Sequence, residues 1–407
     1  MRRANLPRYP AEVRHVLAAK GVRAFGDGYV SLLLPLYLLQ LGLGAIDVGI
    51  IATATLLGSG VLTLVVGAKA HRFGDRTLLL SACVLMAATG AAFATVTSFW
   101  PLLLVAFVGT LNPSSGDVSV FLPLEHAVLS KAVANEERTG AFAAYSIVGS
   151  LAAALGALAA ALPSALQREA GITPLAAMQA MFVLYALLAV VAAVIYRRIP
   201  QAHSAEARPH AALNVSRKKV YALAALFSLD AFGGGLVVQS LLALWLFERF
   251  DLSIAAAGTI FFWTGILSSI SFVVAVKIAR RFGLVNTMVF THIPSSLCLI
   301  AMPFMTTLAP VIALLMVRAA LSQMDVPTRS SYVMAIVTPA ERPAAASLTS
   351  VPRSLASAVS PALGGWMLAA SPFGWPLLAA GVVKIAYDLL LLFTFRKIRP
   401  PEEDRHE

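Results

Sequence analysis

The sequence predicts an all-α integral membrane protein whose twelve transmembrane helices form two six-helix bundles related by a pseudo-two-fold axis. The 407-residue chain is 59% hydrophobic and only 13% charged, and its mean hydropathy is +0.81. Soluble globular proteins do not have this composition. Apolar runs of about eighteen or more residues recur along the chain, and each can cross a hydrocarbon core of roughly 30 Å. They lack the polar–apolar alternation of a transmembrane β-barrel.

Polar, basic or proline- and glycine-containing segments separate the apolar runs and set the boundaries of the predicted spans. These spans are 18–41, 46–69, 77–97, 100–131, 138–163, 174–197, 217–247, 253–279, 285–306, 308–335, 342–369 and 373–396. The basic segment before the first span contains Pro7 and Pro10, and the apolar run that follows is too long and too late for a cleaved signal. We therefore expect no removable targeting segment.

Lysine and arginine are distributed unevenly between the predicted loops. With both termini in the cytoplasm, the cytoplasmic segments together with the adjoining ends of the spans hold 25 of the 31 Lys and Arg residues, the opposite loops hold only Arg168 and Arg249, and the other four lie deeper within spans. Because basic loops stay on the cytoplasmic side, this predicts a multi-pass protein of a bacterial-type inner (cytoplasmic) membrane with both termini cytoplasmic. The net charge of +11 then reflects membrane orientation, and we expect no nucleic-acid partner.

Short matches at nearly constant offsets indicate an internal duplication. At an offset of 207, Phe-Gly-Asp-Gly at 25–28 matches Phe-Gly-Gly-Gly at 232–235, and at 204 Pro123 matches Pro327. In the same order along the chain, such matches predict two halves with parallel topology. We expect an N-terminal bundle at 1–197, a polar cytoplasmic linker at 198–216, a C-terminal bundle at 217–396 and a cytoplasmic tail at 397–407.

The loop between the second and third spans reads Gly-Ala-Lys-Ala-His-Arg-Phe-Gly-Asp-Arg at 67–76. It resembles the signature of the major facilitator superfamily, a resemblance that covers essentially the whole chain. In that family the loop takes part in a cytoplasmic charge network that stabilises one access state, which implies a gating role for Gly67, His71, Arg72, Gly74 and Arg76. His71 replaces the family's usual aspartate, which places the usual form of that network in doubt. The alternative is that the loop is only a tight basic turn.

A second resemblance lies in the eleventh span, where Ser-Pro-Ala-Leu-Gly-Gly at 360–365 is similar to the Gly-Pro-x-x-Gly-Gly pattern of exporters of the family. Those exporters carry the pattern on the fifth helix, and the fifth span here lacks the proline. The displaced pattern favours export only weakly. The alternative is that its small residues allow close helix packing.

Charged residues within the predicted spans are candidate functional residues, because a charge near the bilayer centre costs about 2.5–3.5 kcal/mol. Asp27 in the first span and Asp230 in the seventh both lie beside glycines. The resemblance implies that these two helices line the central cavity, where a desolvated carboxylate suits a proton carrier. The alternative for Asp27 is an ion pair with Arg23, one helical turn away, that only orders the bundle.

The fourth predicted span is too long for a straight crossing, since its residues at 1.5 Å each reach about 48 Å. The sequence Asn-Pro-Ser-Ser-Gly-Asp at 112–117 predicts a break, because proline removes a backbone donor and glycine relaxes the chain. Asp117 at the break and Glu125 about two turns beyond it are candidate ion- or substrate-binding residues. The alternative is a simple kink that leaves Glu125 at the cytoplasmic surface.

The tenth span carries a polar stripe, and the spacing i, i+4, i+7, i+11 puts its members on one helical face: Arg318, Ser322, Asp325 and Arg329. We expect this stripe to bind or gate the substrate, with Asp325 paired to Arg329. Arg353 in the eleventh span is a further candidate. The alternative is that buried ion pairs only fix the helix register.

The twelfth span carries Lys384 and Asp388 four residues apart, a pair that can neutralise itself locally. The resemblance implies that the twelfth helix is peripheral, so we expect this pair to be structural. Among the candidate cavity residues, five carboxylates (Asp27, Asp117, Glu125, Asp230 and Asp325) face three cations (Arg318, Arg329 and Arg353). This count favours a cationic or neutral substrate with protons as counter-ions.

These features predict a secondary transporter that works by alternating access, with proton-coupled export of a drug-like compound or metabolite. The alternative in the same class is a proton- or cation-coupled symporter that imports an organic anion or another small metabolite. An intramembrane enzyme is a remote alternative, because neither an H-E-x-x-H nor a G-x-S-x-G motif is present. We expect a monomer in the lipid bilayer with no catalytic residue, no cofactor and no metal, whose partners are a small-molecule substrate and protons.

Overall fold

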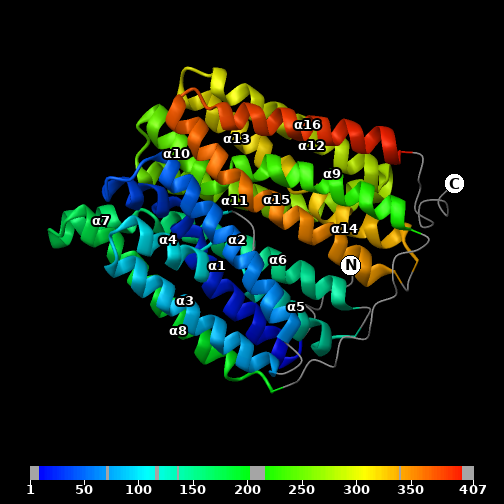
Figure 1. The fold of residues 1–407 in the computed structure, drawn as a ribbon, viewed down its shortest axis with the longest axis horizontal. Coiled ribbons are helices and arrows are strands. Elements are labelled where there is room, and N and C mark those ends of the chain that lie inside the picture. The colour runs from blue at the N-terminus through cyan, green and yellow to red at the C-terminus, as the bar shows by residue number, and fades with distance from the viewer. Residues whose placement is uncertain are drawn as a thin grey trace, which may run out of the picture.

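A computed structural model describes residues 9–69, 73–114, 119–134, 137–201, 216–338 and 341–396. The predicted all-helical fold is confirmed, and most of the helices run along the long axis of the molecule (Figure 1). The helices are α1 (Ala11–Gln40), α2 (Ala45–Lys69), α3 (Asp75–Thr95), α4 (Phe99–Val108), α5 (Phe121–Ala132), α6 (Arg138–Ala159), α7 (Leu162–Ala170), α8 (Pro174–Tyr196), α9 (Arg217–Leu236), α10 (Gln239–Phe250), α11 (Ile254–Phe282), α12 (Leu284–Ala301), the 3₁₀ helix η3 (Met302–Phe304), α13 (Leu308–Ser322), α14 (Asp325–Ile336), α15 (Arg342–Ala370) and α16 (Trp375–Phe395).

Within the described ranges, nine helical segments are long and apolar enough to cross a membrane. The fourth, tenth and eleventh predicted spans are not among these nine. The fourth and tenth are each divided into two shorter helices, α4 with α5 and α13 with α14, whereas α15 is long but carries many polar residues. The three predicted spans that are absent from the nine therefore each contain a break or a polar face.

The two divided segments begin their second helix at equivalent positions. α5 begins at Phe121 and α14 at Asp325, which is the offset of 204 seen between Pro123 and Pro327. Each proline follows two residues after its helix begins. Because proline has no N–H and its ring clashes with the carbonyl four residues earlier, extension of the helix backwards past it is disfavoured. The predicted break in the fourth span is confirmed, and the tenth span has a matching break that was not predicted.

The seventh segment is also interrupted, between the end of α9 at Leu236 and the start of α10 at Gln239. At this interruption the chain contacts the first half. The Ser240 N–H donates to the carbonyl of Pro113 at 3.1 Å, and the Gln239 amide nitrogen donates to the Ser31 hydroxyl at 2.8 Å. Irregular backbone from both halves therefore meets in the interior of the protein.

Helices of the first half, blue to green in Figure 1, cross helices of the second half, green to red. α2 packs against α15, and α6 packs against α11. At the α2–α15 crossing, an added Cβ on Gly365 would lie 2.4 Å from the carbonyl oxygen of Ala45, and the Ala362 N–H donates to the Thr53 hydroxyl at 2.9 Å. The exporter-like pattern at 360–365 thus contributes a close helix crossing.

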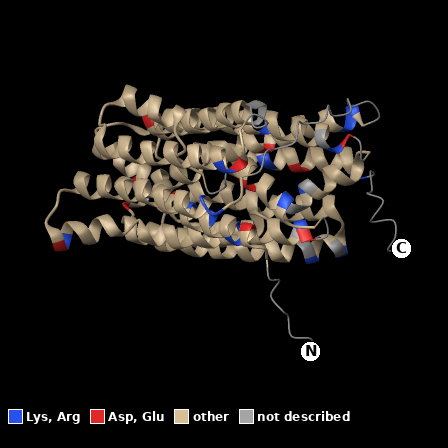
Figure 2. Cartoon of the chain, turned by 90° about the horizontal axis from the view of Figure 1, so that it is seen from below, with Lys and Arg blue, Asp and Glu red and all other residues tan. Residues whose placement is uncertain are grey.

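Charged residues are sparse along most of the helices and are more frequent in the half of the molecule toward the C-terminus of the chain (Figure 2). Some of these charged positions lie along the helices rather than at their ends. Such intramembrane charges require partners.

Close packing of α1 against α6 leads to the first testable prediction. An ideal Cβ on Gly156 would lie 2.0 Å from the carbonyl oxygen of Phe25. Because backbone cannot move aside as a flexible side chain can, we expect Gly156→Ala to lower the unfolding midpoint of the detergent-solubilised protein, with a cost of about 1–3 kcal/mol. Gly60→Ala is the matched control, since nothing lies within 4 Å of its added Cβ. Equal midpoints for the two variants would contradict the prediction.

Candidate functional site

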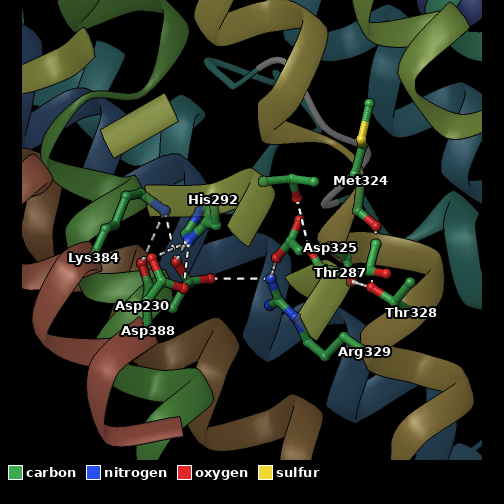
Figure 3. Close-up of polar contacts among 10 residues, drawn as sticks. Asp230, Thr287, His292, Met324, Asp325, Thr328, Arg329, Lys384 and Asp388 are labelled. Atoms are coloured by element: carbon green, nitrogen blue, oxygen red, sulfur yellow. Dashed lines mark hydrogen bonds and ion pairs between the residues drawn. The ribbon is translucent and has the colours of Figure 1, made fainter. Parts of the chain in front are cut away.

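A cluster of charged side chains is buried in the second half, centred on Asp230 of α9 (Figure 3). The Asp230 carboxylate lies 2.7 Å from Nζ of Lys384, 3.1 Å from Nη2 of Arg329 and 3.7 Å from Nε2 of His292. These basic groups come from α16, α14 and α12, respectively. One carboxylate therefore connects four helices, and any change in its charge acts on all of them.

His292 bridges Asp230 to a second buried carboxylate. Its Nδ1 lies 3.0 Å from both carboxylate oxygens of Asp388 on α16, while Nε2 is directed toward Asp230 (Figure 3). An imidazole with a carboxylate at each ring nitrogen can hold a proton and share it with either neighbour. The predicted pairing of Lys384 with Asp388 is wrong, because Lys384 pairs with Asp230 and Asp388 with His292.

His292 was absent from the sequence-based candidates, although it lies within an apolar predicted span where a titratable residue is unusual. His292 would be identified if every titratable residue within the apolar spans were considered, rather than the carboxylates and arginines alone. Lys384 was predicted to be structural, because Asp388 lies four residues away and the resemblance implies a peripheral twelfth helix. Sequence spacing alone does not show which carboxylate a flexible lysine side chain reaches.

Arg329 on α14 completes the cluster. The predicted ion pair with Asp325 is confirmed, and the same guanidinium also contacts Asp230. Its central carbon lies 5.2 Å from the ring centroid of Phe227. Within the described chain, Nε and Nη1 of Arg329 are buried without a hydrogen-bond partner. Arg329 therefore keeps unused donor capacity next to an ion pair.

The predicted stripe does not form one continuous helical face. Arg318 and Ser322 belong to α13, which ends at Ser322, whereas Asp325 and Arg329 belong to α14. Only two residues, Gln323 and Met324, separate the helices, so the predicted stripe is divided between α13 and α14, and its single face stays a prediction. Arg318 is half-buried, has no ion-pair partner among the residues described, and its Nε is buried without a hydrogen bond.

The first half contains a separate buried ion pair between Arg23 of α1 and Glu125 of α5. Glu125 also accepts hydrogen bonds from the hydroxyls of Tyr145 at 2.6 Å and Tyr196 at 2.5 Å. The Arg23 guanidinium carbon lies 3.9 Å from the ring centroid of Phe121. Glu125 is fully buried, so it does not lie at the cytoplasmic surface as the alternative reading of the fourth span required.

Asp27 lies near this pair and is also buried, and its carboxylate lies 3.3 Å from the Tyr185 hydroxyl. That hydroxyl also lies 3.1 Å from the carbonyl oxygen of Thr110, beside the break in the fourth span. The cavity-lining role predicted for Asp27 stays a prediction. The predicted site residue Asp117 lies outside the described residues.

The predicted gating loop is only partly described, since His71 and Arg72 fall outside the described ranges. Gly67 belongs to α2, Gly74 directly precedes α3, and Arg76 is half-buried in the first turn of α3. The neighbouring Asp75 is buried and pairs with Lys131 of α5 at 2.5 Å, which ties the loop to the divided fourth segment. The gating role stays a prediction.

The two buried ion pairs occupy equivalent positions in the duplicated halves, with their charges exchanged. At the offset of 207, Arg23 corresponds to Asp230, and at the offset of 204, Glu125 corresponds to Arg329. In both halves a phenylalanine of the helix that carries the acid covers the guanidinium. The halves thus use one ion-pair geometry with opposite polarity.

The two ion pairs also differ in how fully they are satisfied. A buried ion pair is stabilising only when additional hydrogen bonds satisfy its remaining donors and acceptors. Glu125 accepts from one arginine and two tyrosines, whereas Asp230 is shared between two cations and an imidazole while Arg329 keeps free donors. The second-half cluster is therefore the one in which partners can exchange.

Comparison with known proteins identifies the family and the fold. The sequence model of the family described as the Major Facilitator Superfamily matches residues 16–323 and 223–407. An uncharacterized membrane protein of Saccharomyces cerevisiae is 24% identical over 421 residues, which cover 94% of both chains. A solved bacterial homologue of the human lysosomal transporter Spinster superimposes with a TM-score of 0.73 at 16% identity, over 95% of this chain and 97% of that one. A D-xylose–proton symporter superimposes with a TM-score of 0.70 at 15% identity, over 93% and 96% of the two chains.

Proposed function

This chain belongs to the major facilitator superfamily and is a secondary transporter of that family, and we propose that it couples substrate movement to protons by alternating access. The observation that carries the proposal is the buried cluster in which Asp230 is shared by Lys384, Arg329 and His292. A transporter that uses a proton gradient needs a buried group whose protonation changes the contacts between helices. The family assignment points to transport rather than enzymatic chemistry.

In this proposal the proton acts by changing the partners of Asp230. Protonation removes the negative charge that holds Lys384 and Arg329, so α16 and α14 are released from α9. His292, placed between Asp230 and Asp388, passes the proton between the two carboxylates. Arg329 retains Asp325 as a partner, so it is not left as an isolated buried charge.

The moving bodies in this proposal are the two halves, 1–197 and 217–396, joined by the linker 198–216 and followed by the tail 397–407. The crossings of α2 with α15 and of α6 with α11 bring them together. The Ser269 hydroxyl donates to the Ser150 hydroxyl at 2.8 Å across the α6–α11 crossing. A small hydroxyl–hydroxyl contact of this kind can be exchanged between access states at modest energetic cost.

We propose an inner-membrane location with both termini and the linker in the cytoplasm, on the basis of the uneven distribution of Lys and Arg. Reporter fusions at residue 407 and within the linker are expected to show cytoplasmic activity only. Periplasmic activity at either position would overturn this topology.

For the direction of transport we propose export of a drug-like compound or metabolite by a monomer. The exporter-like pattern at 360–365 supports export, although its glycines also serve helix packing. Import of an organic anion with protons is the second candidate. It is favoured by Arg318, which is half-buried without an acidic partner among the residues described. The direction of the substrate relative to the proton separates the two candidates.

The proposed function is tested with purified protein in proteoliposomes under an imposed pH gradient, using a panel of small organic cations, neutral metabolites and organic anions. We expect at least one compound to accumulate only when the gradient is present, and accumulation to stop when a protonophore collapses the gradient. Export requires accumulation against an opposed proton flux, whereas symport requires both fluxes in the same direction. Accumulation that is insensitive to the protonophore would refute proton coupling.

A further inference from the structure

The middle of α15 has three different faces. An apolar face contains Val351, Leu355 and Val359, which are four residues apart and exposed, as expected for contact with lipid. A second face is buried and includes Thr349 and Ser360. The third face is polar and accessible, with exposed Ser347, Ser350, Arg353 and Ser354 and half-buried Ser357.

The polar face cannot point into hydrocarbon, because an arginine near the middle of a span is too costly to expose to lipid. Arg353 is the twelfth residue of this 29-residue helix, well away from both ends. Its side chain is nevertheless exposed, so it reaches water inside the protein. The polar face of α15 therefore lines a water-accessible interior. The polar face also explains why α15 is not among the nine apolar spans.

Arg353 is the cation of this region without a carboxylate of its own. Among the residues described it makes no hydrogen bond and no ion pair, although it lies within electrostatic range of Arg329, Asp230 and Tyr387. The Asp230 carboxylate is already in contact with Lys384 and Arg329. Arg353 thus adds a positive charge that the protein itself leaves uncompensated.

Arg329 is a second cation of this region with unused hydrogen-bond donors. Its Nε and Nη1 are buried without hydrogen-bond partners within the described chain, and it lies in the electrostatic neighbourhood of Arg353. Two guanidinium groups with free donors repel each other, and an anion between them removes the repulsion and uses the donors. Arginine is also the residue best suited to bind planar carboxylates and phosphates through two parallel hydrogen bonds.

We propose that Arg353 and Arg329, together with the hydroxyl of Ser354, bind an anionic group of the transported substrate, a carboxylate or a phosphate. The proposal rests on the proposed transport function and adds the chemical class of the substrate. The bound anion lies next to the Asp230 cluster, so it competes with that carboxylate for Arg329. Binding of the anion and protonation of Asp230 then favour the same rearrangement, which links substrate to proton in the sense of symport, the second candidate above.

This proposal reverses the substrate class that the residue count favoured. The count treated the carboxylates as available to a cationic substrate, but Asp230, Asp325 and Glu125 are each taken up by an arginine or lysine of the protein. Arg353 and Arg318 have no such partner among the residues described. What remains accessible on α15 is therefore positive.

The test uses charged thiol reagents and does not require the substrate to be known. Cys83 and Cys298, both buried, are replaced by serine, and Ser350→Cys places a thiol one helical turn from Arg353. The reaction rates of an anionic and a cationic methanethiosulfonate are compared. Thr97→Cys, exposed between α3 and α4, gives the reference ratio for a thiol away from the site.

We expect the ratio of anionic to cationic rate at Ser350→Cys to exceed the reference about tenfold, because a positive interior attracts the anion. Adding Arg353→Gln is expected to bring the ratio back toward the reference, and adding Arg353→Lys to preserve it. An unreactive thiol would show that the face is closed. A ratio at or below the reference, or one that Arg353→Gln does not change, would overturn the anion site. None of these outcomes depends on pH-driven transport.

The source of the anion is identified by protection of the same thiol. Benzoate and inorganic phosphate at millimolar concentration are added to protein in phosphatidylcholine vesicles, with benzamide as the neutral control. Slower labelling with benzoate or phosphate, but not with benzamide, supports the proposal and separates carboxylate from phosphate. Protection that appears only in vesicles containing phosphatidylglycerol assigns the site to a lipid headgroup and overturns the substrate reading. No protection by any of these anions also overturns it.

Discussion

Asp230→Asn is expected to abolish substrate accumulation driven by a pH gradient, while exchange of substrate without a gradient continues. The substitution keeps the size of the side chain but removes the charge that Lys384, Arg329 and His292 share. Loss of one partner from a buried, hydrogen-bonded charge pair costs about 2–5 kcal/mol, so the coupled rate should fall about 30-fold or more. Accumulation and counterflow are measured in the same proteoliposomes.

Two controls make this result specific. Asp47→Asn at the start of α2 alters a carboxylate that accepts only a local hydrogen bond from the Gly44 N–H, and it should leave both activities unchanged. Asp27→Asn tests the other predicted proton carrier. If Asp230→Asn is poorly retained in the membrane, the double variant with Lys384→Gln restores the charge balance and is assayed instead. Wild-type accumulation in both Asp230→Asn and Asp27→Asn would place proton coupling elsewhere or exclude it.

The second large effect is expected at the Arg23–Glu125 pair. Either Arg23→Gln or Glu125→Gln leaves one buried charge without its partner, at a cost of about 3–5 kcal/mol. The double variant leaves no unpaired charge, and its two amides can hydrogen-bond to each other. We therefore expect it to be more stable than the weaker of the two single variants. Unfolding midpoints of the purified proteins give the coupling energy through a double-mutant cycle.

Lys131→Gln is the matched control for this cycle. Its partner Asp75 is buried, but the Lys131 side chain is 39% exposed, so the loss should be at most about 1 kcal/mol. Single losses at Arg23 and Glu125 that simply add in the double variant would show that the two residues do not act as a pair. Loss of proton-driven accumulation in the stable double variant would show that the first-half pair also takes part in coupling.

These two predictions assign different roles to equivalent positions. The first-half pair has its carboxylate saturated by one arginine and two tyrosines, which suits a fixed connection between α1 and α5. The second-half pair includes an imidazole, a lysine and an arginine with unused donors, which suits exchange of partners. Reversal of polarity at one geometry shows that this position requires a buried pair, whichever helix provides the cation.

Several features of this protein follow from the sequence alone. Membrane insertion depends on the length and hydropathy of continuous segments, so the all-helical membrane fold was predictable from local composition. The break in the fourth span was also predictable, because proline and glycine act on their own backbone. The Asp325–Arg329 pair was predictable for the same reason, since residues four apart on a helix are neighbours whatever surrounds them.

The tertiary structure decided which charged side chains meet across helices. Nothing in the sequence shows that Glu125 pairs with Arg23, that Lys384 reaches Asp230 in preference to Asp388, or that His292 lies between two carboxylates. The matching break before α14 divided the predicted stripe between two helices, because the spacing rule applies within one continuous helix. Long side chains find partners according to helix orientation and crossing, which depend on the packing of the whole bundle. The sequence by itself therefore determined which residues are charged within the membrane. The tertiary structure decided how these charges pair. Among the charged residues gathered around Asp230, it left only Arg353 exposed and without a carboxylate partner.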